Sequence, residues 1–157
     1  IAAKHDLAHQ ALSAQLQDHT LARTYECLAV GGFREDAGTV DAPIGRHPVD
    51  RKKMAVVSGG RPAVTHWEVL ERFPGLTHLR CRLETGRTHQ IRVHLAHLGR
   101  PILGDTVYGK PVPGLQGQCL HAVGLRFLHP RTGEAVELSC PLPEEFQAQL
   151  RKLAGRL

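Results

Sequence analysis

Long hydrophobic runs and the common cofactor motifs are absent from this sequence. No apolar stretch approaches the roughly 18 residues that cross a membrane, and the first residues carry no signal-peptide pattern. The two glycine pairs belong to neither a G-x-x-x-x-G-K-S/T nor a G-x-G-x-x-G motif, and no G-x-S-x-G segment occurs. The sequence therefore predicts no membrane span, no nucleotide-cofactor fold and no serine-hydrolase elbow.

The four cysteines are widely spaced, and none forms a C-x-x-C pair: they are Cys27, Cys81, Cys119 and Cys140. Isolated cysteines of this kind are typical of reduced core residues in a reducing compartment. We therefore expect free, buried thiols and a cytoplasmic location.

Turn-forming residues are frequent, with 16 glycines and 10 prolines among 157 residues. They favour a chain of short strands over a helical bundle, and the length suits a single domain. No repeat, low-complexity segment or linker interrupts it. We expect one α+β domain over residues 1–157, with a mostly antiparallel mixed sheet flanked by helices.

Hydrophobic periodicity and turn residues divide the chain into expected elements. A helix is expected from Asp6 to about His19, and residues 38–48 are interpreted as a loop. Further helices begin near Thr88, ending at Gly99, and at Pro143. The expected strands cover residues 24–30, 54–57, 63–73, 79–83, 120–128 and 135–138.

Positive charge is in excess, with 20 Lys and Arg against 15 Asp and Glu. A net charge of +5 is compatible with a nucleic-acid partner, but it also suits a merely basic soluble protein. Clustering is more informative. Arg46, Lys52 and Lys53 belong to one basic segment, which is either a solvated loop or a set of phosphate contacts.

The second cluster surrounds the segment that follows the strand ending near Glu84. Gly86 permits a sharp reversal there, and the helix expected from Thr88 directs its free N–H groups and positive dipole end toward the turn. Core packing does not require so many cationic and amide side chains, whereas an anionic, base-bearing ligand does. The cluster comprises Arg87, His89, Gln90, Arg92 and His94.

Three histidines of this segment raise the alternative of a metal-dependent hydrolase. His89, His94 and His97 follow an H-x4-H-x2-H spacing, but no acidic residue joins them and the pattern is not H-E-x-x-H. We therefore predict no metal site and interpret them as solvated or RNA-contacting histidines.

Several segments, in order along the chain, resemble the RluA/RluD-type pseudouridine synthases, and the RluD-like branch in particular. Residues 83–94, LETGRTHQIRVH, are the most specific element. The other similar segments are residues 23–31, 38–48, 62–66, 104–109, 120–122 and 129–130. The resemblance implies the fold of the catalytic domain of that family, and isomerisation of uridine to pseudouridine in RNA.

The resemblance also implies residue roles. Tyr25, which by itself reads as a tyrosine packed in a half-buried sheet, would stack on the target base and help to remove the proton from C5. Arg92 would pair with a catalytic aspartate and keep it ionised, and Leu120 would form an apolar wall. The residues expected to contact substrate or RNA are Arg46, Lys52, Lys53, Arg87, Thr88, His89, Gln90, His94 and Leu120.

The departure from the family concerns the nucleophile. In the family the aspartate stands in a His-Arg-Leu-Asp segment, which the resemblance places upstream of Ile1, and no aspartate here has that context. Asp105, in a Gly-Asp turn, reads as structural. We therefore expect the C-terminal part of one catalytic domain, inactive by itself and monomeric, which needs no metal or organic cofactor and acts on large-subunit ribosomal RNA. The alternative is a non-catalytic RNA-binding module.

Overall fold

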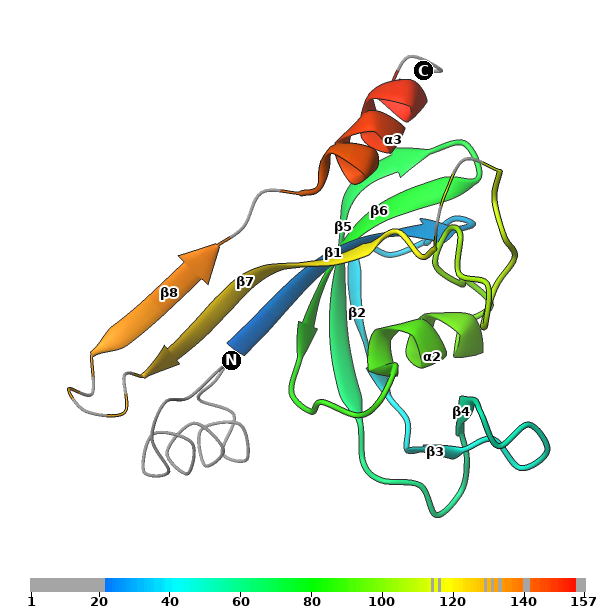
Figure 1. The fold of residues 1–157 in the computed structure, drawn as a ribbon, viewed down its shortest axis with the longest axis vertical. Helices are drawn as coiled ribbons and strands as arrows, with labels where there is room; N and C mark the ends of the chain where they lie inside the picture. The colour runs from blue at the N-terminus through cyan, green and yellow to red at the C-terminus, as the bar shows by residue number, and fades with distance from the viewer. Residues whose placement is uncertain are drawn as a thin grey trace.

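A six-stranded antiparallel sheet forms the body of the protein in the computed structural model (Figure 1). The structure describes residues 22–113, 115, 117–128, 130, 132, 134–139 and 142–154. The helix expected near the start of the chain and Cys140 lie outside these residues. The described part contains sheet and flanking helices, so the α+β prediction is confirmed.

The strands of the large sheet follow the order β2-β5-β6-β1-β7-β8, and β3 pairs with β4 in a separate small sheet. Every strand pair is antiparallel. The elements are β1 (Ala22–Val30), β2 (Ala37–Asp41), β3 (Ile44–Arg46), β4 (Met54–Val56), β5 (Val64–Phe73), β6 (Leu76–Leu83), α2 (Gln90–His97), β7 (Leu120–Leu128), β8 (Ala135–Ser139) and α3 (Glu144–Ala154).

The core is centred on β1, which lies between β6 and β7. Cys27 and Leu28 are both fully buried although they point to opposite faces of the strand, so both faces of the sheet are covered there. Ile91 and Leu95 of α2 join this core, and Phe146 of α3 joins it through a ring contact with His78. The predicted free, buried cysteines are confirmed for Cys27 and Cys81, and Cys119 is buried as predicted.

The segment 38–48 was wrongly interpreted as a loop, because β2 and β3 run through it. Its glycines and prolines concealed the strands. Gly38 lies within β2, where the indole of Trp67 crosses its backbone. A Cβ at residue 38 would lie 2.4 Å from the Trp67 ring. This glycine therefore marks a close approach of side chain to backbone, and not a turn.

Helix α2 lies beside the small β3–β4 sheet, and α3 lies at the other end of the large sheet (Figure 1). Nowhere in the described residues is a helix long and apolar enough to span a membrane. Six of the predicted functional residues meet in the region between β6, β1, β7 and the first turn of α2.

Candidate active site

A cleft of about 270 Å³ opens where the ends of β1, β6 and β7 face the start of α2. It brings together six residues that the sequence singled out: Tyr25, Arg87, His89, Gln90, Arg92 and Leu120. It also contains residues that the sequence did not single out, among them Arg23 and Gln118. The lining is completed by Leu83, Gly86 and Ile91.

Helix α2 starts differently from the prediction. Thr88 is exposed and does not cap it; the N-cap residue is His89, which has a left-handed backbone (φ 56°, ψ 27°) and no side-chain cap bond. In place of a cap, the Arg87 backbone N–H donates to Oε1 of Gln90 at 3.0 Å. His89 is the one non-glycine residue with positive φ among the described residues. Such a conformation costs roughly 1–3 kcal/mol, so the surrounding contacts must hold it.

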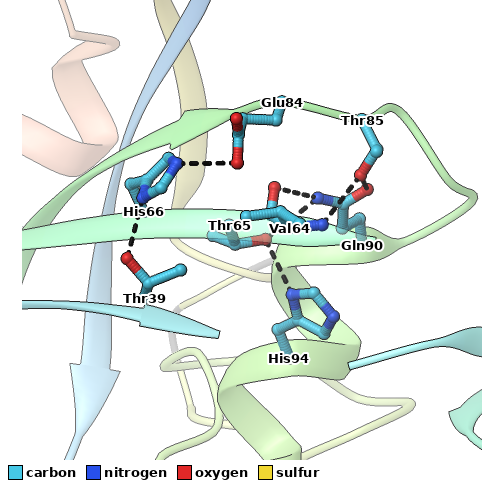
Figure 2. A network of polar contacts seen from close by, with 8 residues as sticks. All are labelled: Thr39, Val64, Thr65, His66, Glu84, Thr85, Gln90 and His94. Carbon is cyan, nitrogen blue, oxygen red and sulfur yellow. Dashed lines mark hydrogen bonds and ion pairs between the residues drawn. The ribbon is translucent and has the colours of Figure 1, made fainter. Parts of the chain in front are cut away.

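The carboxamide of Gln90 fastens α2 to β5 (Figure 2). Its Nε2 donates to the Val64 carbonyl at 2.9 Å and to Thr65 Oγ1 at 3.0 Å. Its Oε1 accepts from Thr85 Oγ1 at 2.7 Å as well as from the Arg87 N–H. Both amide protons and both oxygen lone pairs are thus used within the protein.

His94, one helical turn later, makes the second fastening (Figure 2). Its Nε2 donates to the Ala42 carbonyl at 2.9 Å, so Nδ1 is left to accept from Thr65 Oγ1 at 2.7 Å. Burial lowers the pKa of His94, and the bond to Ala42 opposes this only in part. The ring is therefore neutral near pH 7, and it is fully buried.

These bonds correct two of the predicted RNA contacts. His94 has no exposed surface through which to contact RNA, and the polar atoms of Gln90, which is 3% exposed, are saturated. The three-histidine metal alternative likewise loses His94 as a ligand, because both ring nitrogens are bonded within the protein. Within the described residues, no group of three or more His, Cys, Asp or Glu could hold a metal ion.

Thr65 is the residue on which both fastenings meet, so its hydroxyl is expected to matter. Thr65→Val keeps the shape but leaves a donor of Gln90 and an acceptor of His94 unsatisfied in the core. We expect the free energy of unfolding to fall by about 1–3 kcal/mol, measured by urea denaturation. Thr39→Val is the matched control, because Thr39 bonds to a histidine in an exposed setting and should change stability by less than about 0.5 kcal/mol. Equal losses in the two variants would contradict this interpretation.

Arg92 lies between the two fastened residues and lines the cleft. Its Nε and Nη2 donate to the two carboxylate oxygens of Asp105 at 2.8 and 2.9 Å, and its guanidinium lies 5.1 Å from the centre of the Tyr108 ring. The Arg92 side chain is 11% exposed and the Asp105 side chain 0%. A bidentate pair in this setting fixes the plane of the guanidinium.

The Asp105 carboxylate is held by four hydrogen bonds, since Oδ1 also accepts from the backbone N–H groups of Val107 and Tyr108 at 3.0 Å each. Burial acts to raise the pKa of Asp105, but the bonds from Arg92 and from the two N–H groups outweigh it and leave the pKa below its ordinary value. The same pairing raises the pKa of Arg92. Asp105 therefore serves as a structural counter-ion for Arg92, in agreement with its interpretation from sequence.

Tyr108 was part of the resembling segments but had no role assigned to it. Its hydroxyl accepts from the Met54 N–H of β4 at 3.0 Å and bonds to Nδ1 of His89 at 2.9 Å. Burial, and next to it the nearby Arg92 charge, lowers the pKa of His89. A neutral His89 accepts at Nδ1 a hydrogen bond donated by the Tyr108 hydroxyl, and this bond helps to hold the left-handed residue in place.

Tyr25 and Leu120 enter the cleft from neighbouring strands. The β1–β7 register shifts between Thr24 and Tyr25, because one extra residue of β7 lies opposite this step. Such a bulge turns the following side chains and often adjoins a functional site. Tyr25 and Leu120 are both half-buried and line the cleft, so they offer one aromatic and one aliphatic surface to a ligand.

The remaining predicted contacts lie outside the cleft. Arg46, Lys52 and Lys53 belong to the β3–β4 hairpin, where Arg46 donates to the Arg51 carbonyl at 3.1 Å. Lys53 lines a separate hollow of about 340 Å³, which includes Tyr108. This basic segment therefore lies outside the cleft. Tyr108 connects the two, because it contacts the cleft residues His89 and Arg92.

The sequence matches a family of known proteins. A family model described as RNA pseudouridylate synthase matches residues 1–97. The chain belongs to this family.

Curated pseudouridine synthases from bacteria are close in sequence. An uncharacterised RNA pseudouridine synthase of Bacillus subtilis, YlyB, is 49% identical over 152 residues, which cover 96% of this chain and 50% of that protein. Ribosomal large subunit pseudouridine synthase D of Pseudomonas aeruginosa is 49% identical over 153 residues, with 88% of this chain and 48% of that protein covered. The resemblance to the RluA/RluD type is thereby confirmed, and the chain spans about half the length of these relatives.

A solved pseudouridine synthase structure shares the fold. Human RNA pseudouridylate synthase domain containing 4 superposes with a TM-score of 0.78 at 26% identity, covering 96% of this chain and 69% of that one. The architecture around the cleft is thus that of a pseudouridine synthase domain.

Proposed function

We propose that this chain is the C-terminal part of the catalytic domain of an enzyme that isomerises uridine to pseudouridine in large-subunit ribosomal RNA. The observation that carries the proposal is the convergence of Tyr25, Arg92 and Leu120 on one cleft. Three relatives at 48–49% identity that are named ribosomal large subunit pseudouridine synthase D support the choice of RNA.

The cleft suits a base that has left its stack. Uracil has to be detached from ribose at N1, rotated and rejoined through C5, so it must first be extruded from the RNA. Stacking on an aromatic ring is worth about 1–3 kcal/mol for an unpaired base. Tyr25 supplies the ring and Leu120 an apolar wall, which together hold a flat, uncharged heterocycle.

Arg92 supplies the charge that the chemistry requires. In a poorly hydrated cleft a carboxylate tends to take up a proton, and an adjacent guanidinium keeps it ionised. Arg92 has five N–H donors, and Asp105 engages two of them in the bonds described above. We predict that the others pair with the aspartate that the family resemblance places upstream of Ile1.

The proposal makes a direct test possible. The full-length protein is expected to release tritium from 5-tritiated uridine in ribosomal RNA, whereas the 157-residue chain is expected to release none, because it lacks an aspartate in the family context. Release by the 157-residue chain contradicts the placement of the nucleophile. Pseudouridine maps of ribosomal RNA that stay unchanged after deletion of the gene contradict the proposed substrate.

A second candidate function is an RNA-binding module without turnover. The positively charged cleft favours this module as much as it favours the enzyme. The module predicts RNA binding with no pseudouridine even at saturating protein.

Size-exclusion chromatography and cell fractionation test the two remaining expectations, a monomer and a cytoplasmic location.

A further inference from the structure

Arg23 is the one cleft arginine for which the described residues offer no acceptor at its buried nitrogens. Its Nε and Nη2 are buried and have no hydrogen-bond partner there. The other two differ, because Arg92 is paired with Asp105 and Nε of Arg87 donates to the Pro62 carbonyl at 2.8 Å. Buried donors without acceptors are costly and uncommon, so such a group calls for an external partner.

The position of Arg23 is set by the sheet and by Gly86. Arg23 lies two residues before Tyr25 on β1, opposite Leu83 of β6, and lines the same cleft. Its guanidinium lies against the backbone of Gly86, where an added Cβ would stand 2.4 Å from Nη2 and 3.0 Å from Cζ. A Cβ at residue 86 would displace the end of the Arg23 side chain from this position, so glycine here permits the observed close approach.

The electrostatics of the cleft specify the partner. Three arginines line it, and none of the described lining residues is Asp or Glu. Asp105, just outside, neutralises Arg92 alone. The surplus positive charge therefore lies beside Tyr25, the ring on which the proposed function stacks the target base.

We propose that Arg23 is a phosphate-binding residue of the cleft, which grips a backbone phosphate next to the flipped nucleotide. The inference rests on the proposed function, because it takes RNA as the ligand. A guanidinium suits this role, since its planar fork can donate two parallel bonds to phosphate oxygens. Binding of the phosphate draws the guanidinium from Gly86 toward the cleft and gives its buried N–H groups their acceptors.

The test measures RNA affinity of the full-length protein by fluorescence anisotropy over a series of salt concentrations. Arg23→Met is expected to weaken binding about tenfold or more and to reduce the slope of log affinity against log salt by about 0.7, the value for one single-strand phosphate contact. Arg72→Met is the matched control, because Arg72 is an exposed arginine paired with Asp36 away from the cleft.

An oligonucleotide with uncharged methylphosphonates flanking the target uridine identifies the partner. Wild-type protein should lose affinity for it, and Arg23→Met should lose little further. A variant that is folded by circular dichroism yet keeps wild-type affinity and salt slope overturns the proposal, as does a loss of thermal stability alone, which would point to a carboxylate partner within the protein. If wild-type protein forms pseudouridine in either case, only the role of Arg23 falls; if it neither binds nor converts RNA, the proposed function falls with it.

Discussion

Arg92→Ala is expected to lower kcat for pseudouridine formation by the full-length protein about 100- to 1,000-fold, the usual effect of removing one preorganised electrostatic group from a reacting centre. The guanidinium is oriented by Asp105 and lies against the Tyr108 ring, so its position in the cleft is fixed by the fold. Single-turnover tritium release measures the chemical step without the contribution of product release.

The design must separate chemistry from folding, because Arg92→Ala also leaves the buried Asp105 carboxylate without its counter-ion. The variant is therefore assayed at a temperature at which circular dichroism shows it folded. Arg92→Lys keeps the charge but loses the bidentate fork, so its rate should lie between those of wild type and Arg92→Ala. The exposed Arg72→Ala is the control and should retain the wild-type rate. A folded Arg92→Ala protein with near-normal kcat removes Arg92 from the mechanism.

Asp105→Ala is expected to lower the free energy of unfolding by about 3–5 kcal/mol, the cost of leaving one partner of a buried ion pair alone. The substitution removes four hydrogen bonds at once, two from Arg92 and two from backbone N–H groups. Asp36→Ala is the control: Asp36 pairs with Arg72 in an ion pair whose side chains are 90% and 47% exposed, and its loss should be small. Denaturant unfolding at pH 7 compares the two, and equal effects would show that burial of Asp105 adds nothing.

The same carboxylate predicts a dependence of stability on pH. Because the pKa of Asp105 is lower in the folded protein than in the unfolded chain, its contribution is fully present above the unfolded value, near pH 4. The contribution is lost as the pH falls through the lower, folded value. Wild type and Asp105→Asn should therefore differ most near neutral pH and converge in strong acid. A stability difference that stays constant down to pH 2 contradicts this linkage.

The positions of most strands along the chain could be predicted, since alternation and turn residues are local signals. The strand 120–128 agrees with β7 residue for residue, and the strand expected at 63–73 agrees with β5 except at its first residue. Tyr25, Arg92 and Leu120 were singled out through the resemblance to a family. Local patterns and family motifs both survive without knowledge of the tertiary contacts.

The side of α2 on which each polar residue lies could not be predicted. Gln90 and His94 look like ligand-binding residues in the sequence, yet their partners Val64 and Thr65 are about 25 residues away and give no local signal. Arg23 was missed for the opposite reason, because an arginine in a strand reads as a solvent-facing residue. Burial of a polar group is a tertiary property, and only the contact partners reveal it.

The small β3–β4 sheet is hydrogen-bonded to the rest of the protein at both ends, and this affects how the sequence can diverge. Ile44 at one end exchanges hydrogen bonds with Arg61, and Met54 at the other is held by the Tyr108 hydroxyl. Residues 47–53 emerge beyond both attachments, so insertions, deletions and charge changes there need not disturb His89 or the cleft. Selection can therefore alter the charge of this hairpin tip, and with it the predicted contact with RNA, independently of the cleft.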